Sequence, residues 1–115
     1  MDGNPQAADD GRPALLARGV ELVRAGDGFA AHEVFEELWR AAEPADRDFF
    51  QGLVHVAVAP YQEARGHHVG SRSQLAKARR RLAPYAPAHR GVDVAALLTW
   101  CDRCLARGRC EAPPL

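Results

Sequence analysis

The sequence contains little of what builds β-sheets. Isoleucine is absent, threonine occurs only once, and no stretch alternates apolar and polar residues over the length of a strand. Alanine, arginine and leucine are abundant instead, and these residues favour helices. We therefore expect an all-α protein.

The sequence also lacks an excess of charge and a long apolar run. Lys and Arg total 15, and so do Asp and Glu, so nothing in the charge favours nucleic acid or an anionic membrane as a partner. The basic residues between Lys77 and Arg81 indicate a solvated helix face. No run approaches the roughly 20 apolar residues that span a bilayer. The expected partner is a small molecule or a protein or peptide, and the chain is either a monomer or a homodimer.

A secretory signal is absent from the first residues, which are polar and acidic. We therefore expect a cytoplasmic protein with reduced cysteines. A length of 115 residues suits one domain. We expect a disordered tail over residues 1–12, a helical domain over 13–108, and a frayed end over 109–115, where two prolines follow each other.

Helical periodicity predicts about five helices. They cover residues 14–24 with Pro13 in the first turn, 28–43, 45–65, 70–85 and 92–107, and Gly108 ends the last one. Short turns between them predict antiparallel helical hairpins. Apolar residues surround the third helix almost completely, so it should be the central one of a compact bundle.

The segment 31–40 carries the most distinctive pattern. His32, Glu36 and Trp39 share one helix face beside an apolar stripe. On the following helix, Arg47 and Gln51 lie one turn apart. We expect a polar seam between these two helices in which Glu36 pairs with Arg47, because a half-buried carboxylate needs a partner.

This seam admits two functional interpretations. The first is a binding or interaction module, in which arginines and aromatic rings surround a carboxylate, a phosphate or a peptide. Its candidate binding residues are His32, Glu33, Glu36, Trp39, Arg47, Gln51, His55, Tyr61 and Arg65.

The second interpretation is a small hydrolase-like enzyme, either metal-assisted or acid/base. His32 and Glu36 are its candidate catalytic residues, as general bases. Together with His55 they are also the candidate ligands of zinc or ferrous iron. We expect no cofactor, because the motif differs from that of zinc proteases and arginines share the stripe of His55. No serine, threonine or cysteine nucleophile lies in the motif.

The cysteines near the end of the chain, Cys101, Cys104 and Cys110, include a C-x-x-C pair. Such a pair can be redox-active or half of a zinc site. Leu97, Cys101 and Cys104 share one helix face, so we expect buried thiols that act as small apolar side chains.

Several of these motifs together resemble a known family. The H-E-x-x-E-x-x-W pattern that starts at His32, followed by F-x-Q-G-L from Phe49, is similar to the domain-of-unknown-function family 309 over about residues 14–85. The resemblance implies a small all-helical protein and no assigned reaction. His55, Pro60 and Gln62 depart from the family pattern.

Overall fold

The computed structural model describes the backbone of residues 5–115 and the side chains of residues 12–115. It contains five α-helices and a short 3₁₀ helix, which confirms the expected all-α class. The elements are α1 (Pro5–Arg24), α2 (Gly28–Ala41), α3 (Pro44–Ala64), α4 (His68–Leu82), η1 (Ala83–Tyr85) and α5 (Val94–Arg107). Within these described ranges no strand is formed, and the only β-bridge joins His89 to Val92.

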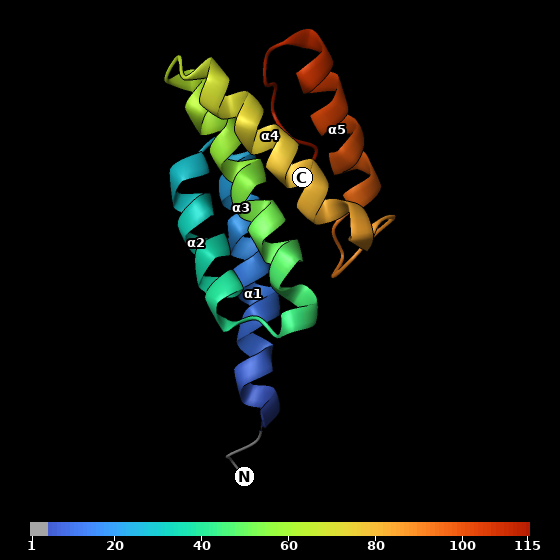
Figure 1. The fold of residues 1–115 in the computed structure, drawn as a ribbon. Helices are drawn as coiled ribbons and strands as arrows, with labels where there is room; N and C mark the ends of the chain where they lie inside the picture. The colour runs from blue at the N-terminus through green and yellow to red at the C-terminus, as the bar shows by residue number, and fades with distance from the viewer. Residues whose placement is uncertain (1–4) are drawn as a thin grey trace.

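The helices pack in chain order. α1 contacts α2, α2 contacts α3, α3 contacts α4, and α5 packs on α4. In Figure 1, α3 lies between α2 and α4, and α5 stands on the side of α4 away from α2. This central position of α3 confirms what its all-round apolar pattern predicts. No helix in the described part of the chain is long and apolar enough to cross a membrane.

The core is built around α3. Its fully buried side chains include Phe49, Leu53 and Val56, and α5 adds Trp100. At Gly52 the packing against α4 is so close that a Cβ would lie 2.6 Å from Leu82 Cγ. Such close packing holds α3 in one position between its neighbours, so functional side chains on α3 stand on a rigid support.

Helix ends follow the expected chemistry. The Asp27 carboxylate accepts a hydrogen bond from the Ala30 N–H at the start of α2, and the N-cap Asp93 does the same at α5. Gly108 closes α5 in a left-handed conformation with φ 73°, as predicted from sequence. Pro60 does not end α3, which continues as a helix to Ala64.

Residues 5–12, where we expect part of a disordered tail, belong to a helix in the structure. α1 begins at Pro5 rather than at Pro13, and Pro13 lies inside the helix. An interior proline removes only one backbone donor. Arg12 also fixes this part of α1, because its Nη2 donates to the carbonyl oxygen of Ala41 at 2.9 Å. The first four residues of the expected tail lie outside the described ones.

Residues 109–115, where we expect a frayed end, contact the rest of the bundle. This segment is not helical, but hydrogen bonds hold it at both ends. The indole nitrogen of Trp100 donates to the Glu111 carbonyl oxygen at 3.0 Å, and Arg24 donates to the Leu115 carbonyl oxygen at 2.8 Å. Consecutive prolines exclude a helix here, but they do not exclude a fixed position against the bundle.

Candidate functional site

Three aromatic rings form a groove where the start of α2 meets the second half of α3. The ring centroids of Phe29 and His32 are 5.3 Å apart, and those of Phe29 and Tyr61 are 5.8 Å apart. Phe29 is 50% exposed, which is unusual for so large an apolar side chain. The groove has a volume of about 210 Å³. We call it the aromatic groove; its lining residues are Gly28, Phe29, His32, Val58, Tyr61 and Gln62.

A second, mainly apolar concavity adjoins the groove, because Gly28 and Tyr61 line both. This apolar pocket has a volume of about 150 Å³. Gly28 allows α2 and α3 to approach here, since a Cβ at this position would lie 2.6 Å from the Ala57 carbonyl oxygen. The remaining lining residues are Val23, Gly26, Ala57, Pro60, Ala64, Ala112 and Pro113. Both concavities therefore depend on one close contact between two helices.

His32 offers a free ring nitrogen to this surface. Its Nδ1 lies 2.8 Å from the Phe29 carbonyl oxygen; a carbonyl can only accept, so Nδ1 carries a proton. Nε2 lies 3.6 Å from Glu36 Oε1, too far for a hydrogen bond. In the neutral ring Nε2 therefore has a lone pair for a donor on a ligand, and in the protonated ring it forms an ion pair with Glu36.

Two arginines stack on aromatic rings of the same helices. The guanidinium of Arg47 lies 5.1 Å from the centre of the Trp39 ring, and that of Arg65 lies 5.4 Å from the centre of the Tyr61 ring. Within the part of the chain whose side chains are described, neither arginine forms an ion pair. Both present cations that a carboxylate can bind in a bidentate way.

The ion pair expected between Glu36 and Arg47 is wrong. Glu36 is 40% exposed, and its charged neighbours are His32 and Arg40 of its own helix, the latter at 3.9 Å. Because the carboxylate is hydrated, it needs no partner from α3. Arg47 packs on Trp39 instead. Of the remaining candidates on this side, Glu33 is exposed and Gln51 is half-buried.

The expected metal ligands are not brought together. His55 Nδ1 donates to Gln74 Oε1 on α4 at 2.6 Å, whereas His32 and Glu36 contact residues of α2. Burial and the cations of α4 lower the pKa of His55, and its hydrogen bond to Gln74 only partly offsets this. Among the described side chains, no three His, Cys, Asp or Glu residues are placed to hold a metal ion. His55, which we expect in the seam between α2 and α3, thus lies between α3 and α4.

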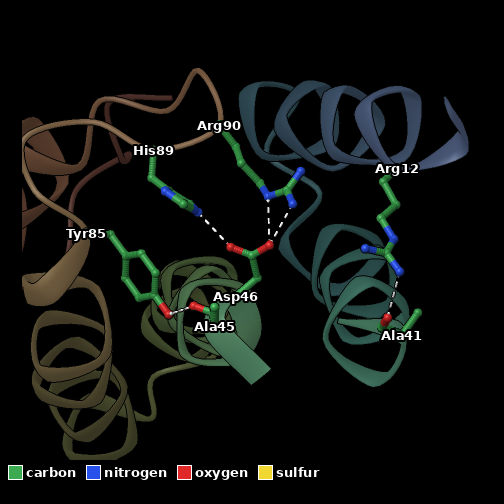
Figure 2. A network of polar contacts seen from close by, with 7 residues as sticks. All are labelled: Arg12, Ala41, Ala45, Asp46, Tyr85, His89 and Arg90. Carbon is green, nitrogen blue, oxygen red and sulfur yellow. Dashed lines mark hydrogen bonds and ion pairs between the residues drawn. The ribbon is translucent and has the colours of Figure 1, made fainter. Parts of the chain in front are cut away.

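A network that the sequence did not reveal lies at the opposite end of α3. The Asp46 carboxylate accepts hydrogen bonds from His89 Nε2 at 2.8 Å and from Arg90 Nη2 at 2.6 Å (Figure 2). Beside it, the Tyr85 hydroxyl donates to the Ala45 carbonyl oxygen at 2.6 Å. The hydrogen bond from Arg90 holds the pKa of Asp46 below its ordinary value, although burial acts in the opposite direction.

We call the hydrogen-bonded group of Asp46, His89 and Arg90 the Asp46 clamp, because its contacts are those of a structural element. Asp46 is 12% exposed at its side chain, and both of its oxygens are hydrogen-bonded. Arg90 adopts a positive φ of 49°, which a non-glycine residue keeps only where its surroundings hold it. The clamp fixes the link between α4 and α5 to the start of α3. From sequence, Asp46 is visible only as an acid in the first turn of a helix.

The thiols of the last helix are buried as expected. Cys101 and Cys104 have no exposed surface, and neither forms a disulfide. Burial raises the pKa of Cys101 to about 12, and burial also raises that of Cys110 to about 12. At neutral pH these two side chains are therefore thiols, which are poor nucleophiles and poor metal ligands.

Comparison with known proteins identifies a family but no function. No curated protein and no solved structure matches the chain. One family model, described as a domain of unknown function (DUF309), matches residues 16–74. The match covers α2, α3, the last part of α1 and the first part of α4, and so includes Phe29, Trp39 and Tyr61. Since these 59 residues are just over half of the 115 in the chain, the protein belongs to the DUF309 family.

Proposed function

We propose that this protein is a binding module that recognises a peptide segment of a protein partner on the surface formed by α2 and α3. The observation that carries the proposal is the aromatic groove next to the apolar pocket, with Tyr61 as the wall between them. Exposed large apolar side chains beside a concave surface are typical of interaction sites.

The dimensions of the surface favour a peptide over a compact ligand. The concavities are about 210 and 150 Å³ and adjoin each other. A drug-sized ligand usually occupies one pocket of about 300 Å³ or more. Two adjacent small sites suit two neighbouring side chains of one chain segment, each filling one of them.

Charge adds a second element of recognition. The guanidinium of Arg65 lies over the ring of Tyr61, which lines the groove, and a carboxylate of the bound segment would meet it without first displacing an ion pair to a described side chain. His32 Nε2 would accept a hydrogen bond from a backbone N–H or a hydroxyl of the same segment. An enzyme that relies on His32, Glu36 and His55 finds no such support, because His55 faces α4.

A random peptide library displayed on phage tests this proposal. Peptides selected on the wild-type protein should bind Phe29→Ala and Tyr61→Ala at least about tenfold more weakly, as expected for central aromatic contacts. Val69→Ala is the matched control, because Val69 is 77% exposed on α4 and lines neither concavity.

Circular dichroism of each variant separates loss of binding from loss of fold. Phe29 is half exposed, so its replacement leaves the core intact even if Tyr61→Ala is less stable. Selected peptides that bind all variants equally would refute the proposed surface. So would a library that yields no binding peptide.

A further inference from the structure

The last residues of the chain cross the apolar pocket as a strap. We define the strap as residues 111–115; in Figure 1 it follows the turn at the end of α5 and leads back to the middle of the molecule. Ala112 and Pro113 line the apolar pocket together with Pro60 and Tyr61. Part of the candidate site is therefore already in contact with a proline-containing segment of the same chain.

Specific contacts hold the strap on α5. The Glu111 carboxylate accepts hydrogen bonds from Arg103 Nε and Arg107 Nη1, each at 3.0 Å. The Glu111 carbonyl oxygen accepts the indole N–H of Trp100, also at 3.0 Å. Farther along, Leu115 is tied to Arg24 at the end of α1. The strap thus bridges the last helix and the first one over the pocket.

These contacts are of a kind that opens easily. The side chains of Glu111, Arg103 and Arg107 are 40%, 40% and 56% exposed, and exposed ion pairs contribute little to stability. Neither Ala112 nor Pro113 is fully buried. A segment held in this way exchanges with a competitor that makes the same contacts.

The contacts of the strap define the chemistry of such a competitor. The competitor needs a carboxylate to bind Arg103 and Arg107, and a carbonyl oxygen of an extended backbone to accept the indole N–H of Trp100. It also needs a proline ring to pack against the wall formed by Tyr61 and Pro60. Extended proline-containing segments suit aromatic-lined surfaces, because they lose little conformational entropy on binding.

We propose that the strap is an internal occupant of the binding surface, and that the partner segment is an extended peptide with an acidic residue two positions before a proline. This inference rests on the proposed function and names the class of its ligand. The partner displaces the strap, so the apparent affinity depends on the fraction of molecules in which the strap is open.

The test uses the full chain and two acetylated synthetic peptides, Glu-Ala-Pro-Pro-Leu and Glu-Ala-Ala-Ala-Leu. Binding is followed by the backbone N–H signals of Ala112 and Leu115 in nuclear magnetic resonance spectra of the isotope-labelled protein, which should move toward those of an unbound segment as the unlabelled peptide displaces the strap. The proline peptide should bind Glu111→Ala about fivefold more tightly than wild type, because this variant loses two exposed ion pairs of the strap. It should bind at least about tenfold more tightly than the alanine peptide.

Two further variants serve as controls. Glu37→Ala removes the same charge from an exposed position on α2 and should leave the affinity unchanged. The double variant Arg103→Ala/Arg107→Ala also frees the strap, but it should show no gain in affinity, because the glutamate of the peptide has lost its two partners.

The proposal is overturned if wild type and Glu111→Ala bind the proline peptide equally. Equal affinity for the two peptides, or unchanged signals of Ala112 and Leu115 at millimolar peptide, overturns it as well. These failures are distinct from failure of the proposed function. Suppose that the library peptides lack proline and bind wild type and Glu111→Ala equally, but lose affinity for Tyr61→Ala. This result would support the binding surface and reject the strap as its occupant.

Discussion

The two ends of α3 differ in how far the polar groups there are hydrogen-bonded within the fold and the aromatic rings there are buried. Near its start, Asp46 is bonded through both oxygens and is largely shielded from solvent. Near its end, Tyr61 separates two open concavities, and Phe29 beside it is half exposed. Fifteen residues separate Asp46 from Tyr61, which is about 22 Å along a helix.

This difference assigns separate roles to two clusters that both contain a histidine, an arginine and aromatic rings. A group whose bonding capacity is fully used within the fold has nothing left for a ligand, so it contributes to stability. A surface that keeps apolar area, a ring nitrogen and cations exposed has the means to bind a partner. Stability and binding should therefore respond to different substitutions.

The largest expected effect is loss of the Asp46 clamp. Asp46→Ala should lower the free energy of unfolding by about 2–3 kcal/mol, because it leaves the N–H donors of His89 and Arg90 without their acceptor. We place it below the range for deeply buried pairs, since His89 and Arg90 are themselves about one third exposed. Urea titration measures the loss, and Asp48→Ala, whose side chain is 53% exposed, should cost less than about 1 kcal/mol.

Acid should weaken the same clamp. The pKa of Asp46 is lowered in the folded chain, so its contribution is complete above the ordinary aspartate pKa of about 4 and declines as the pH falls below it. The difference in unfolding free energy between wild type and Asp46→Asn should be smaller at pH 3 than at pH 5. A difference that grows between pH 5 and pH 3 would contradict the direction of this pKa shift.

At the other end of α3, Phe29→Ala should separate binding from stability. Because half of the side chain is already exposed, the free energy of unfolding should fall by less than about 1 kcal/mol. Peptide binding should fall at least about tenfold, as expected for a central aromatic contact. A variant that keeps its affinity but loses stability as Asp46→Ala does would show that Phe29 contributes to the stability of the fold and not to binding.

The smallest expected effect concerns Glu36. It is 40% exposed and has charged neighbours only on its own helix among the described side chains. Glu36→Ala and the neighbouring Glu37→Ala should each change the free energy of unfolding by less than about 0.5 kcal/mol. A large loss for Glu36→Ala alone, in the same urea titration, would mean that this carboxylate has a partner across the helices.

Local patterns in the sequence predict the helices and the central place of α3. The apolar periodicity around Leu53 and the glycine at position 108 follow from rules that act within a few residues. Predictions that depend on two helices meeting at a given register are less successful. The spacing predicts that Glu36 meets Arg47, but Arg47 packs on Trp39 instead.

Contacts between distant segments escape sequence analysis for a related reason. Asp46 and Arg90 are 44 positions apart, and no periodicity connects an acid in a first helical turn with a cation in a proline-rich link. The strap escapes as well, because prolines exclude a helix but do not indicate where an extended segment lies. The sequence indicates His32 and Tyr61 as candidate binding residues, but it does not indicate Phe29, whose ring lies against both of theirs.

The central claim is that the end of α3 near Tyr61 binds a partner and the end near Asp46 does not. The most direct measurement is a nuclear magnetic resonance titration of the isotope-labelled protein with a library-selected peptide. We expect the backbone signals that shift to cluster at residues 28–32 and 58–62 and along the strap, and those of residues 45–49 and 89–92 to stay in place. Shifts confined to the Asp46 clamp or to the exposed face of α4 would contradict it.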